Sequence, residues 1–266
     1  MTGQLGTKIN KILKIWPPGT VAATSWLESH GVYHQLASDY QRSAWIKRIG
    51  HGAFIRDGDQ VEWQGALYAI QKHLKLPVHA AAKTALELQG ITHFVSSGPD
   101  KTVHLFGTPR TKLPIWFKKQ NWKADIRFTA TLLFSGNGDL GCIEKNIGGF
   151  SIRISSRERA ALELLHLIPH EQQFDEACLL FESLRTLRPE LVQKLLENCR
   201  SIKAKRLFLH FADSTNQEWL KELNLSKVNL GKGKRVIAEG GVFIPKYDIS
   251  VPKISQGVES EELEGP

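Results

Sequence analysis

The first 45 residues contain three short stretches with helical periodicity, and this run limits the possible folds more than any other part of the sequence. Residues 7–16 place apolar side chains at i, i+3, i+4 and i+7 with lysines between them, which predicts an amphipathic helix ended by a Pro-Pro-Gly sequence. A second short helix is expected over residues 21–30 and a third over residues 33–44. Gly31 supplies the tight turn between these two helices.

A hairpin pattern follows directly. Residues 45–49 and 53–56 predict two short strands joined by the glycine-flanked loop Gly50-His51-Gly52. Three helices, a tight turn and a basic hairpin in this order predict a winged helix-turn-helix domain. In that fold the third helix fits the major groove of DNA, the second crosses the phosphates, and the hairpin reaches the neighbouring backbone or minor groove. A winged helix that serves only protein contacts is the alternative.

The rest of the chain mixes helix and strand patterns, which predicts an α+β protein with a larger mixed α/β C-terminal domain. The predicted helices cover residues 59–74, 79–90 and much of 156–223, and the predicted strands are 91–95, 102–107, 115–117, 126–134 and short pieces of 234–251. Asp59 with Glu62 three positions later indicates a capping box, and so does Ser155 with Glu158. We expect a winged domain with a helical extension over residues 1–95, a C-terminal domain over 96–255 and an acidic, disordered tail over 256–266.

Positive charge is concentrated in the first part of the chain. Residues 1–155 contain 19 Lys and Arg against 10 Asp and Glu, whereas residues 156–266 contain 16 against 17. A basic half points to a polyanionic partner, most often nucleic acid. A basic but inert surface is the alternative.

The sequence favours a cytoplasmic protein. No apolar run approaches the ~18 residues that span a bilayer, and the first twenty residues lack the pattern of a secretory signal. The three cysteines, Cys142, Cys178 and Cys199, lie far apart without CxxC spacing. Their odd number argues against a disulfide scaffold and fits a reducing compartment.

No pattern indicates catalysis, a metal site or a cofactor. His166 and His170 have ligand-like spacing, but Pro169 interrupts the helix that would align them. The loop Gly231-Lys232-Gly233-Lys234-Arg235 is glycine-rich and basic, but it lacks the length and the strand-and-helix setting of a P-loop. We therefore expect a protein that is not an enzyme and holds neither metal nor cofactor.

Aromatic side chains alternate with lysines around residue 118. Trp116, Phe117 and Trp122 lie among Lys118, Lys119 and Lys123. Such a pattern can stack and clamp single-stranded nucleic acid. A core edge with solvated lysines is the more frequent arrangement at this spacing, and the sequence leaves both open.

Eight segments carry a family resemblance when they are taken together. They are WLESHGVYHQLASDYQRSAWIKRIGHGAFIRDGD (26–59), VEWQGALYAIQK (61–72), VHAAAKTALELQG (78–90), VHLFG (103–107), LPIWF (113–117), KAKRLFLHFAD (203–213), LGKGKRVIAEGG (230–241) and KYDISVP (246–252). In combination they resemble the AbiEi-type antitoxins of bacterial abortive-infection, type IV toxin–antitoxin systems. The resemblance covers roughly residues 5–253.

The resemblance implies a protein with two tasks. The winged domain of such antitoxins binds inverted repeats in double-stranded DNA of its own promoter and represses the operon. The larger C-terminal domain counteracts a co-encoded nucleotidyltransferase-like toxin without requiring a stable complex. Carried over to this chain, the expected DNA contacts are His34, Gln35, Ser38, Gln41 and Arg42 on the third helix, Lys47, Arg48, His51 and Arg56 around the hairpin, and Lys8 and Lys11 on the first helix.

The third helix carries one arginine and no lysine, so its specificity would rest on amide and hydroxyl groups. Gln35 or Gln41 suits adenine, and Arg42 suits guanine. Two rival functions stay open. One is a nucleic-acid-processing enzyme that the winged domain targets, and the other is a protein-interaction scaffold that does not bind DNA.

Overall fold

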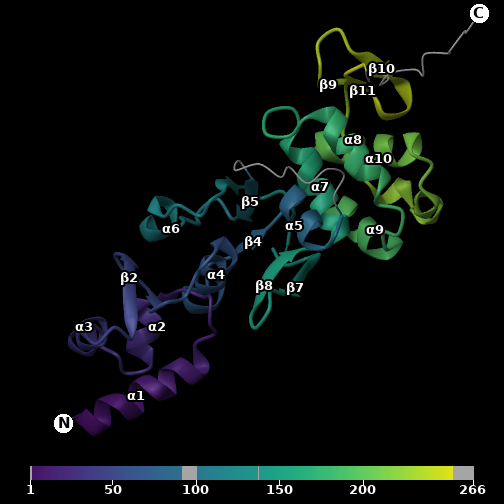
Figure 1. Ribbon diagram of the computed structural model, residues 1–266. Helices are drawn as coiled ribbons and strands as arrows, with labels where there is room; N and C mark the ends of the chain where they lie inside the picture. Colours follow the sequence, from purple (N-terminus) through teal and green to yellow (C-terminus); the bar gives the residue numbers. More distant parts are fainter. Residues whose placement is uncertain (1, 92–100, 137, 254–266) are drawn as a thin grey trace, which may run out of the picture. The chain divides into compact units, whose positions relative to one another are not determined.

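The computed structural model describes residues 2–91, 101–136 and 138–253, which form two compact units, residues 1–160 and 161–266 (Figure 1). The expected domain boundary at 95/96, most of the strand expected over 91–95 and the expected acidic tail lie outside the described residues. The mixture of helices and several sheets confirms the α+β class.

Residues 2–56, called the head below, form three helices and a three-stranded antiparallel sheet of order β1-β3-β2. The helices are α1 (Thr2–Ile15), α2 (Thr24–Ser29) and α3 (His34–Arg42), and the strands are β1 (Ala22–Ala23), β2 (Ile46–Gly50) and β3 (Ala53–Arg56). The order of the elements and the pairing of the strands are those of a winged helix, in which β2 and β3 form the wing. Part of the helix expected over 21–30 is strand, because Ala22 and Ala23 pair with β3.

The apolar stripe of α1 closes the core of the head. Ile9, Ile12 and Trp16 are at most 3% exposed and pack against side chains of α2, α3 and the wing. Burial of one aliphatic side chain of this size contributes roughly 1.5–3 kcal/mol. Arg56 of β3 donates hydrogen bonds to the carbonyls of Leu13 and Trp16 at the end of α1. A cation there satisfies carbonyls that lack helical partners.

The segment after the head forms shorter helices than the sequence predicts. They are α4 (Trp63–Tyr68), a π-helical turn η1 (Ala69–His73) and α5 (Ala82–Leu88). The expected capping box at Asp59 is wrong: α4 begins after Glu62, and the Asp59 carboxylate instead accepts a hydrogen bond from the backbone N–H of Gly19 at 2.8 Å. The helix expected over 79–90 also starts later, because β4 (Val78–Ala80) pairs into a sheet.

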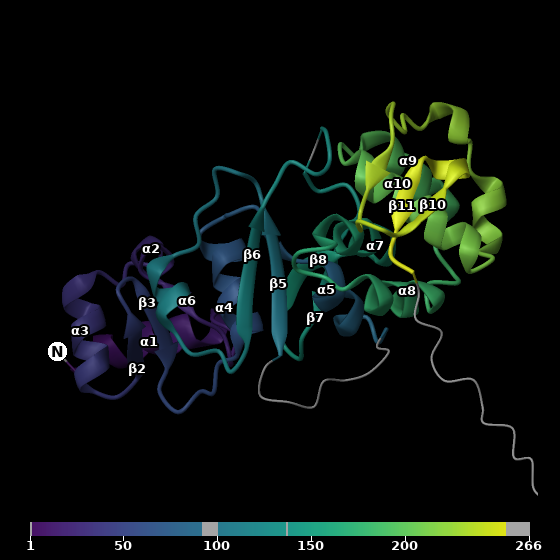
Figure 2. The same ribbon diagram turned by 90° about the horizontal axis from the view of Figure 1, so that it is seen from above.

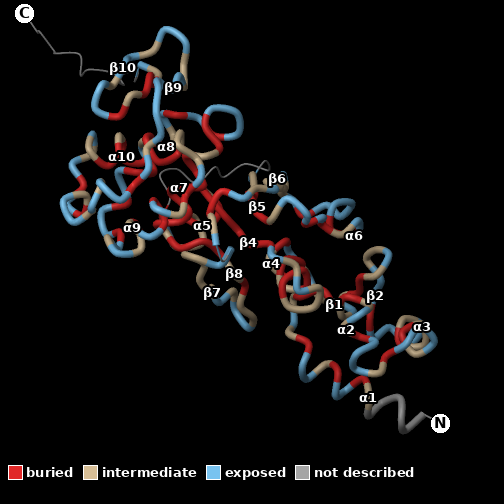
Figure 3. The backbone as a smooth tube through the Cα atoms, turned by 180° about the vertical axis from the view of Figure 1, so that it is seen from behind, coloured by how far each residue is buried: buried red, intermediate tan, exposed pale blue. Residues whose placement is uncertain are grey.

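That sheet is the centre of the first unit and has the order β6-β5-β4-β8-β7 (Figure 2). Its other strands are β5 (Thr102–Gly107), β6 (Asp125–Ala130), β7 (Cys142–Asn146) and β8 (Ser151–Ser155). β4 is antiparallel to β5 and parallel to β8, so a segment preceding residue 95 forms an inner strand. The inner strands β4 and β5 are almost wholly buried, whereas the residues of β7 are half-buried or exposed (Figure 3). The strand expected over 115–117 is wrong: these residues begin α6 (Ile115–Lys119), which follows Pro114.

The second unit is mainly helical. α7 (Arg157–Leu167) runs into it, and α8 (Phe174–Glu182), α9 (Pro189–Asn198), α10 (Ile202–Ser214) and the 3₁₀ turns η2 (Glu218–Glu222), η3 (Leu225–Lys227) and η4 (Pro245–Tyr247) follow. Phe181, Phe208 and Trp219 are buried and pack edge-to-face or tilted, with ring centroids 5.1–6.4 Å apart. A small sheet, β10-β11-β9, is formed by β9 (Arg235–Val236), β10 (Val242–Ile244) and β11 (Ile249–Val251).

The buried arginine of α10 fastens the loops around this small sheet. Arg206 is 2% exposed and donates to the carbonyls of Leu230, Gly233 and Asp248 at 2.7–2.8 Å. The glycine-rich loop at 231–235 is therefore held by its backbone.

Candidate nucleic-acid interface

α3 and the wing border one hollow of about 300 Å³. Five of the residues expected to contact DNA line it: His34, Ser38 and Gln41 of α3, Arg48 of β2 and His51 of the wing tip. These residues are up to 17 positions apart in the sequence. The fold brings them to one surface, which we call the α3–wing groove.

The polar surface of α3 follows from its amphipathic pattern. Ala37 and Tyr40 are buried in the core of the head, whereas His34, Gln35 and Arg42 are exposed. No charged residue occupies the buried side, so burial of the apolar stripe turns the polar side chains outward.

Asp39 organises two of the polar side chains on α3. Its carboxylate forms an ion pair with Arg42 and accepts a long hydrogen bond, 3.5 Å, from Nε2 of Gln35. The Arg42 side chain is 72% exposed, so this pair contributes little to stability. The pairing partly neutralises a carboxylate that would repel DNA phosphates.

The wing presents its cations on β2 and its tip. Lys47, Arg48 and His51 are exposed, and Nε of Arg48 donates to the carbonyl of Gly50 at 3.1 Å. The strand pairing shifts register between Arg48 and Gly50, which is a bulge. Gly52 has φ +87°, a conformation that favours glycine, and its carbonyl accepts from the N–H of Thr24 at the start of α2. The wing tip is thereby tied to α2.

Six of the eleven expected residues do not line the α3–wing groove: Gln35 and Arg42 of α3, Lys47 of β2, Arg56 of β3, and Lys8 and Lys11 of α1. Lys8 donates from Nζ to the carbonyl of Gly31 at 2.5 Å, and Arg56 bonds the end of α1 as described above. Both cations hold the helices of the head together. Lys11 is exposed on α1.

A histidine outside the head supports α2. The ring of His73 in η1 stacks on Trp26 with centroids 4.5 Å apart, and its Nδ1 accepts a hydrogen bond from the N–H of Ala23 at 3.4 Å. Burial, and after it the nearby His30 and Lys75, lower the pKa of His73 to about 4. His73 is therefore neutral at neutral pH, as an acceptor at this position requires.

The aromatic and lysine residues around position 118 support the wing. Trp116, Phe117 and Trp122 are at most 7% exposed, so their rings belong to the core and do not form an open stacking platform. α6 packs on β2, and its Lys118 and Lys119 are exposed. Sequence reasoning did not place these lysines beside the wing, because the contact joins segments some 65 positions apart.

Residues 2–91, 101–136 and 138–253 contain neither a metal-binding cluster nor a membrane-spanning helix. No group of three or more His, Cys, Asp or Glu side chains there is arranged to hold a metal ion. Within the same residues, every helix is too short or too polar to cross a membrane.

The sequence matches the profiles of two known domain families. The sequence profile of the N-terminal domain of AbiEi antitoxin transcriptional regulators matches residues 6–97. A second profile, described as transcriptional regulator, AbiEi antitoxin, type IV toxin–antitoxin system, matches residues 100–252. The chain belongs to the AbiEi antitoxin family. No curated protein has a significantly similar sequence.

A solved structure shares the fold of this AbiEi-family protein. The RV2827C protein from Mycobacterium tuberculosis aligns with a TM-score of 0.58 over 92% of this chain and 90% of that chain, at 12% sequence identity. At this identity the likeness concerns the fold alone. The expected family is thus confirmed, and the chain is a member of a family of antitoxins that are transcriptional regulators.

Proposed function

We propose that this AbiEi-family protein represses its own operon by binding double-stranded DNA at inverted repeats of the promoter, and that it counteracts a co-encoded nucleotidyltransferase-like toxin. The α3–wing groove carries the first part of the proposal. It gathers amide, hydroxyl, imidazole and guanidinium groups from α3 and the wing on a basic head, beside the Glu28 carboxylate of α2. Neither a metal nor a cofactor has a role in this mechanism, and the protein is not an enzyme in it.

Binding proceeds in two physical steps. Lys47, Arg48 and the exposed Lys11 attract DNA phosphates and release counterions, which supplies affinity without sequence preference. α3 then presents Gln35, Gln41 and Arg42 to base edges in the major groove, where adenine and guanine offer matching donors and acceptors. Lys8 and Arg56 keep the helices of the head in place for this contact.

The proposed division of labour assigns DNA binding to residues 1–95 and toxin neutralisation to residues 96–255. A fragment that starts at residue 96 would lack β4, which is an inner strand of the central sheet. Experiments that separate the two tasks therefore need the full chain with substitutions in the α3–wing groove.

Fluorescence anisotropy with a duplex from upstream of the gene, and with a random duplex of equal length, tests DNA binding. We expect wild-type protein to bind the upstream duplex at least tenfold more tightly. Ser38→Glu, which places a negative charge inside the α3–wing groove, should abolish the preference, whereas Ser38→Ala should retain most of it. Equal binding of both duplexes by the wild-type protein would refute the regulatory part.

Co-expression with the neighbouring toxin gene tests the second task. The Ser38→Glu chain should rescue growth as well as wild type does, because the substitution lies in the head. Failure of rescue by a folded Ser38→Glu chain would show that the two tasks share one surface.

A further inference from the structure

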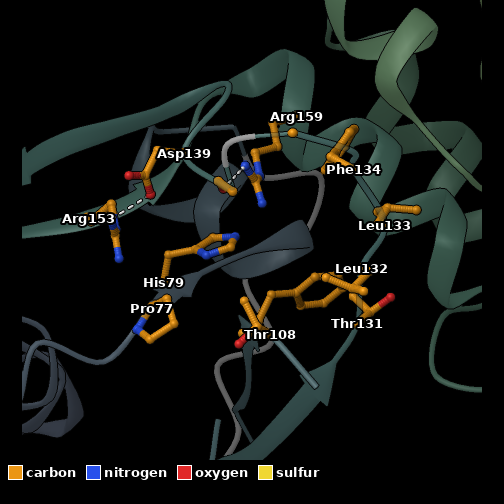
Figure 4. A pocket seen from close by; sticks show the side chains of 14 residues that line it. Pro77, His79, Thr108, Thr131, Leu132, Leu133, Phe134, Asp139, Arg153 and Arg159 are labelled. Atoms are coloured by element: carbon orange, nitrogen blue, oxygen red, sulfur yellow. Dashed lines mark hydrogen bonds and ion pairs between the residues drawn. The ribbon is translucent and has the colours of Figure 1, made fainter. Parts of the chain in front are cut away.

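A second hollow, of about 120 Å³, lies in the first unit, at the carboxyl ends of β5 and β6 and next to residues 138–139 (Figure 4). Several waters fit in this volume, since one occupies ~30 Å³ in the liquid. The polar side chains that line it are His79, Thr108, Thr131, Asp139, Arg153 and Arg159. We call this hollow the two-arginine cavity.

Arg159 is a fixed cation of the cavity. It is 6% exposed, and its Nη1 donates to the carbonyls of Gly138 and Leu140, both at 2.7 Å. Its guanidinium also lies 4.8 Å from the centre of the Phe134 ring. Figure 4 shows the Arg159 side chain entering the cavity toward the ring of His79, which is 5% exposed. A guanidinium held in this way is oriented before a ligand arrives.

Arg153 supplies a second cation from β8. Its Nη1 pairs with the Asp139 carboxylate at 2.6 Å. Its Nε is buried and has no hydrogen-bond partner among the described residues, which is costly for an N–H of a charged group. The Asp139 side chain is 57% exposed and lies on a glycine-rich turn, so the carboxylate occupies the outer edge of the cavity. Because the Asp139 carboxylate pairs with Arg153 there, this side of the cavity suits an anion that offers oxygen atoms.

We propose that the two-arginine cavity binds a phosphate-class oxyanion, either inorganic phosphate or the terminal phosphate of a monoester, which replaces the Asp139 carboxylate on Arg153. Two guanidinium groups at one hollow match the charge and the planar oxygen pairs of a phosphate dianion. The ring of His79 lines the same space. The volume admits a phosphate group and leaves a nucleoside outside.

Entry of the anion exchanges one partner of Arg153 for another. The Arg159 bonds to Gly138 and Leu140 hold the backbone of residues 138–140 during this exchange, while the Asp139 side chain is released to solvent. Removal of the competing carboxylate should therefore strengthen anion binding. A purely structural Arg153–Asp139 pair predicts no such gain.

Isothermal titration of the full chain with inorganic phosphate in a low-chloride buffer tests the proposal. Wild-type protein should show one saturable site. Asp139→Asn should bind phosphate at least about threefold more tightly than wild type. Arg153→Gln should bind it at least about tenfold more weakly, and this tenfold loss corresponds to ~1.4 kcal/mol. The matched controls are Asp125→Asn and Arg127→Gln, which alter an exposed Asp–Arg pair on β6 outside the cavity.

Three outcomes would overturn the proposal. They are the absence of saturable binding by wild-type and Asp139→Asn protein, equal affinities for cavity and control variants, and displacement of phosphate by short random duplex DNA. The last would make the cavity part of the DNA-binding surface. Titration with a ribose phosphate identifies the source: tighter binding than inorganic phosphate supports a monoester, and equal or weaker binding supports the free anion. The failure of operator binding leaves these titrations unaffected, because none of the variants lies in the α3–wing groove.

Discussion

Gly50 of the wing lies directly against Trp116 of α6: a Cβ built on Gly50 would be 2.7 Å from the Cβ of Trp116. The space between them leaves no room for a side chain. Residues of the two family domains thus meet at the wing, and α6 supports the strand that carries Lys47 and Arg48.

A side chain at position 50 should separate the wing from α6. Gly50→Val is expected to cost about 1–3 kcal/mol of unfolding free energy through overpacking, and to weaken operator binding because β2 moves. Chemical denaturation and anisotropy measure the two effects. Gly138→Ala is the control for the stability loss, because its Cβ would meet no atom within 4 Å. Unchanged stability and binding in Gly50→Val would show that the wing does not depend on α6.

Arg42 and Arg48 should differ in the kind of binding that they support. Arg42→Ala is expected to cost about 1–3 kcal/mol on the operator alone if it contacts a base, whereas Arg48→Ala should weaken all sequences and reduce the salt slope by about 1. Anisotropy on operator and random duplexes over a salt series separates the two. Lys14→Ala, an exposed lysine of α1 outside the groove, is the control. Equal losses by Arg42→Ala on both duplexes would make it a phosphate contact.

Much of the head could be predicted from the sequence, because its elements are set by local patterns. The stripe of α1, the glycine turn at residue 31 and the Gly-His-Gly hairpin each depend on neighbours within a few residues. The same locality explains the groove, since the outward side of α3 follows from its buried Ala37 and Tyr40.

The errors occur where distant segments decide the local structure. An alanine-rich run such as residues 79–82 favours a helix by propensity, yet pairing with β5 and β8 makes part of it a strand. Residues 115–117 have apolar β-forming side chains, but Pro114 and burial of Trp116 and Phe117 against the core favour one helical turn. The two-arginine cavity could not be found from the sequence, because Asp139, Arg153 and Arg159 match no spacing motif.

His73 should make stability depend on pH. Its pKa is about 4 in the folded chain, below the ordinary histidine value of 6.5, so the unfolded chain binds more protons between these two values. The contribution of neutral His73 is complete above about pH 6.5 and is lost as the pH falls toward 4; at ~1.4 kcal/mol per pKa unit, the difference of about 2.5 between the two pKa values amounts to roughly 3.5 kcal/mol. Denaturation of wild-type protein at pH 7.5 and pH 5 should show the decrease.

His73→Phe should reduce this decrease, since it keeps a ring against Trp26 and removes the titrating group. Part of the decrease should persist, because burial also lowers the pKa of His166 and His210 in the second unit. His170→Phe, at an exposed position, should leave the pH dependence unchanged. A pH dependence in His73→Phe identical to that of wild type would contradict the assignment.

A substitution of Arg206 in the second unit should impair toxin neutralisation without impairing DNA binding. Its guanidinium is buried and holds three carbonyls, so Arg206→Met leaves those acceptors without their donor and should cost about 3 kcal/mol or more. The glycine-rich loop at 231–235 and the small sheet then lose their anchor. Toxin rescue should fail, while operator affinity stays within about twofold of wild type, because the head has its own core. Arg235→Met, an exposed arginine of β9, is the matched control and should retain rescue. If Arg206→Met loosens the second unit in hydrogen exchange and still rescues growth, neutralisation does not depend on this unit, and the surface sought for it would lie within residues 96–160.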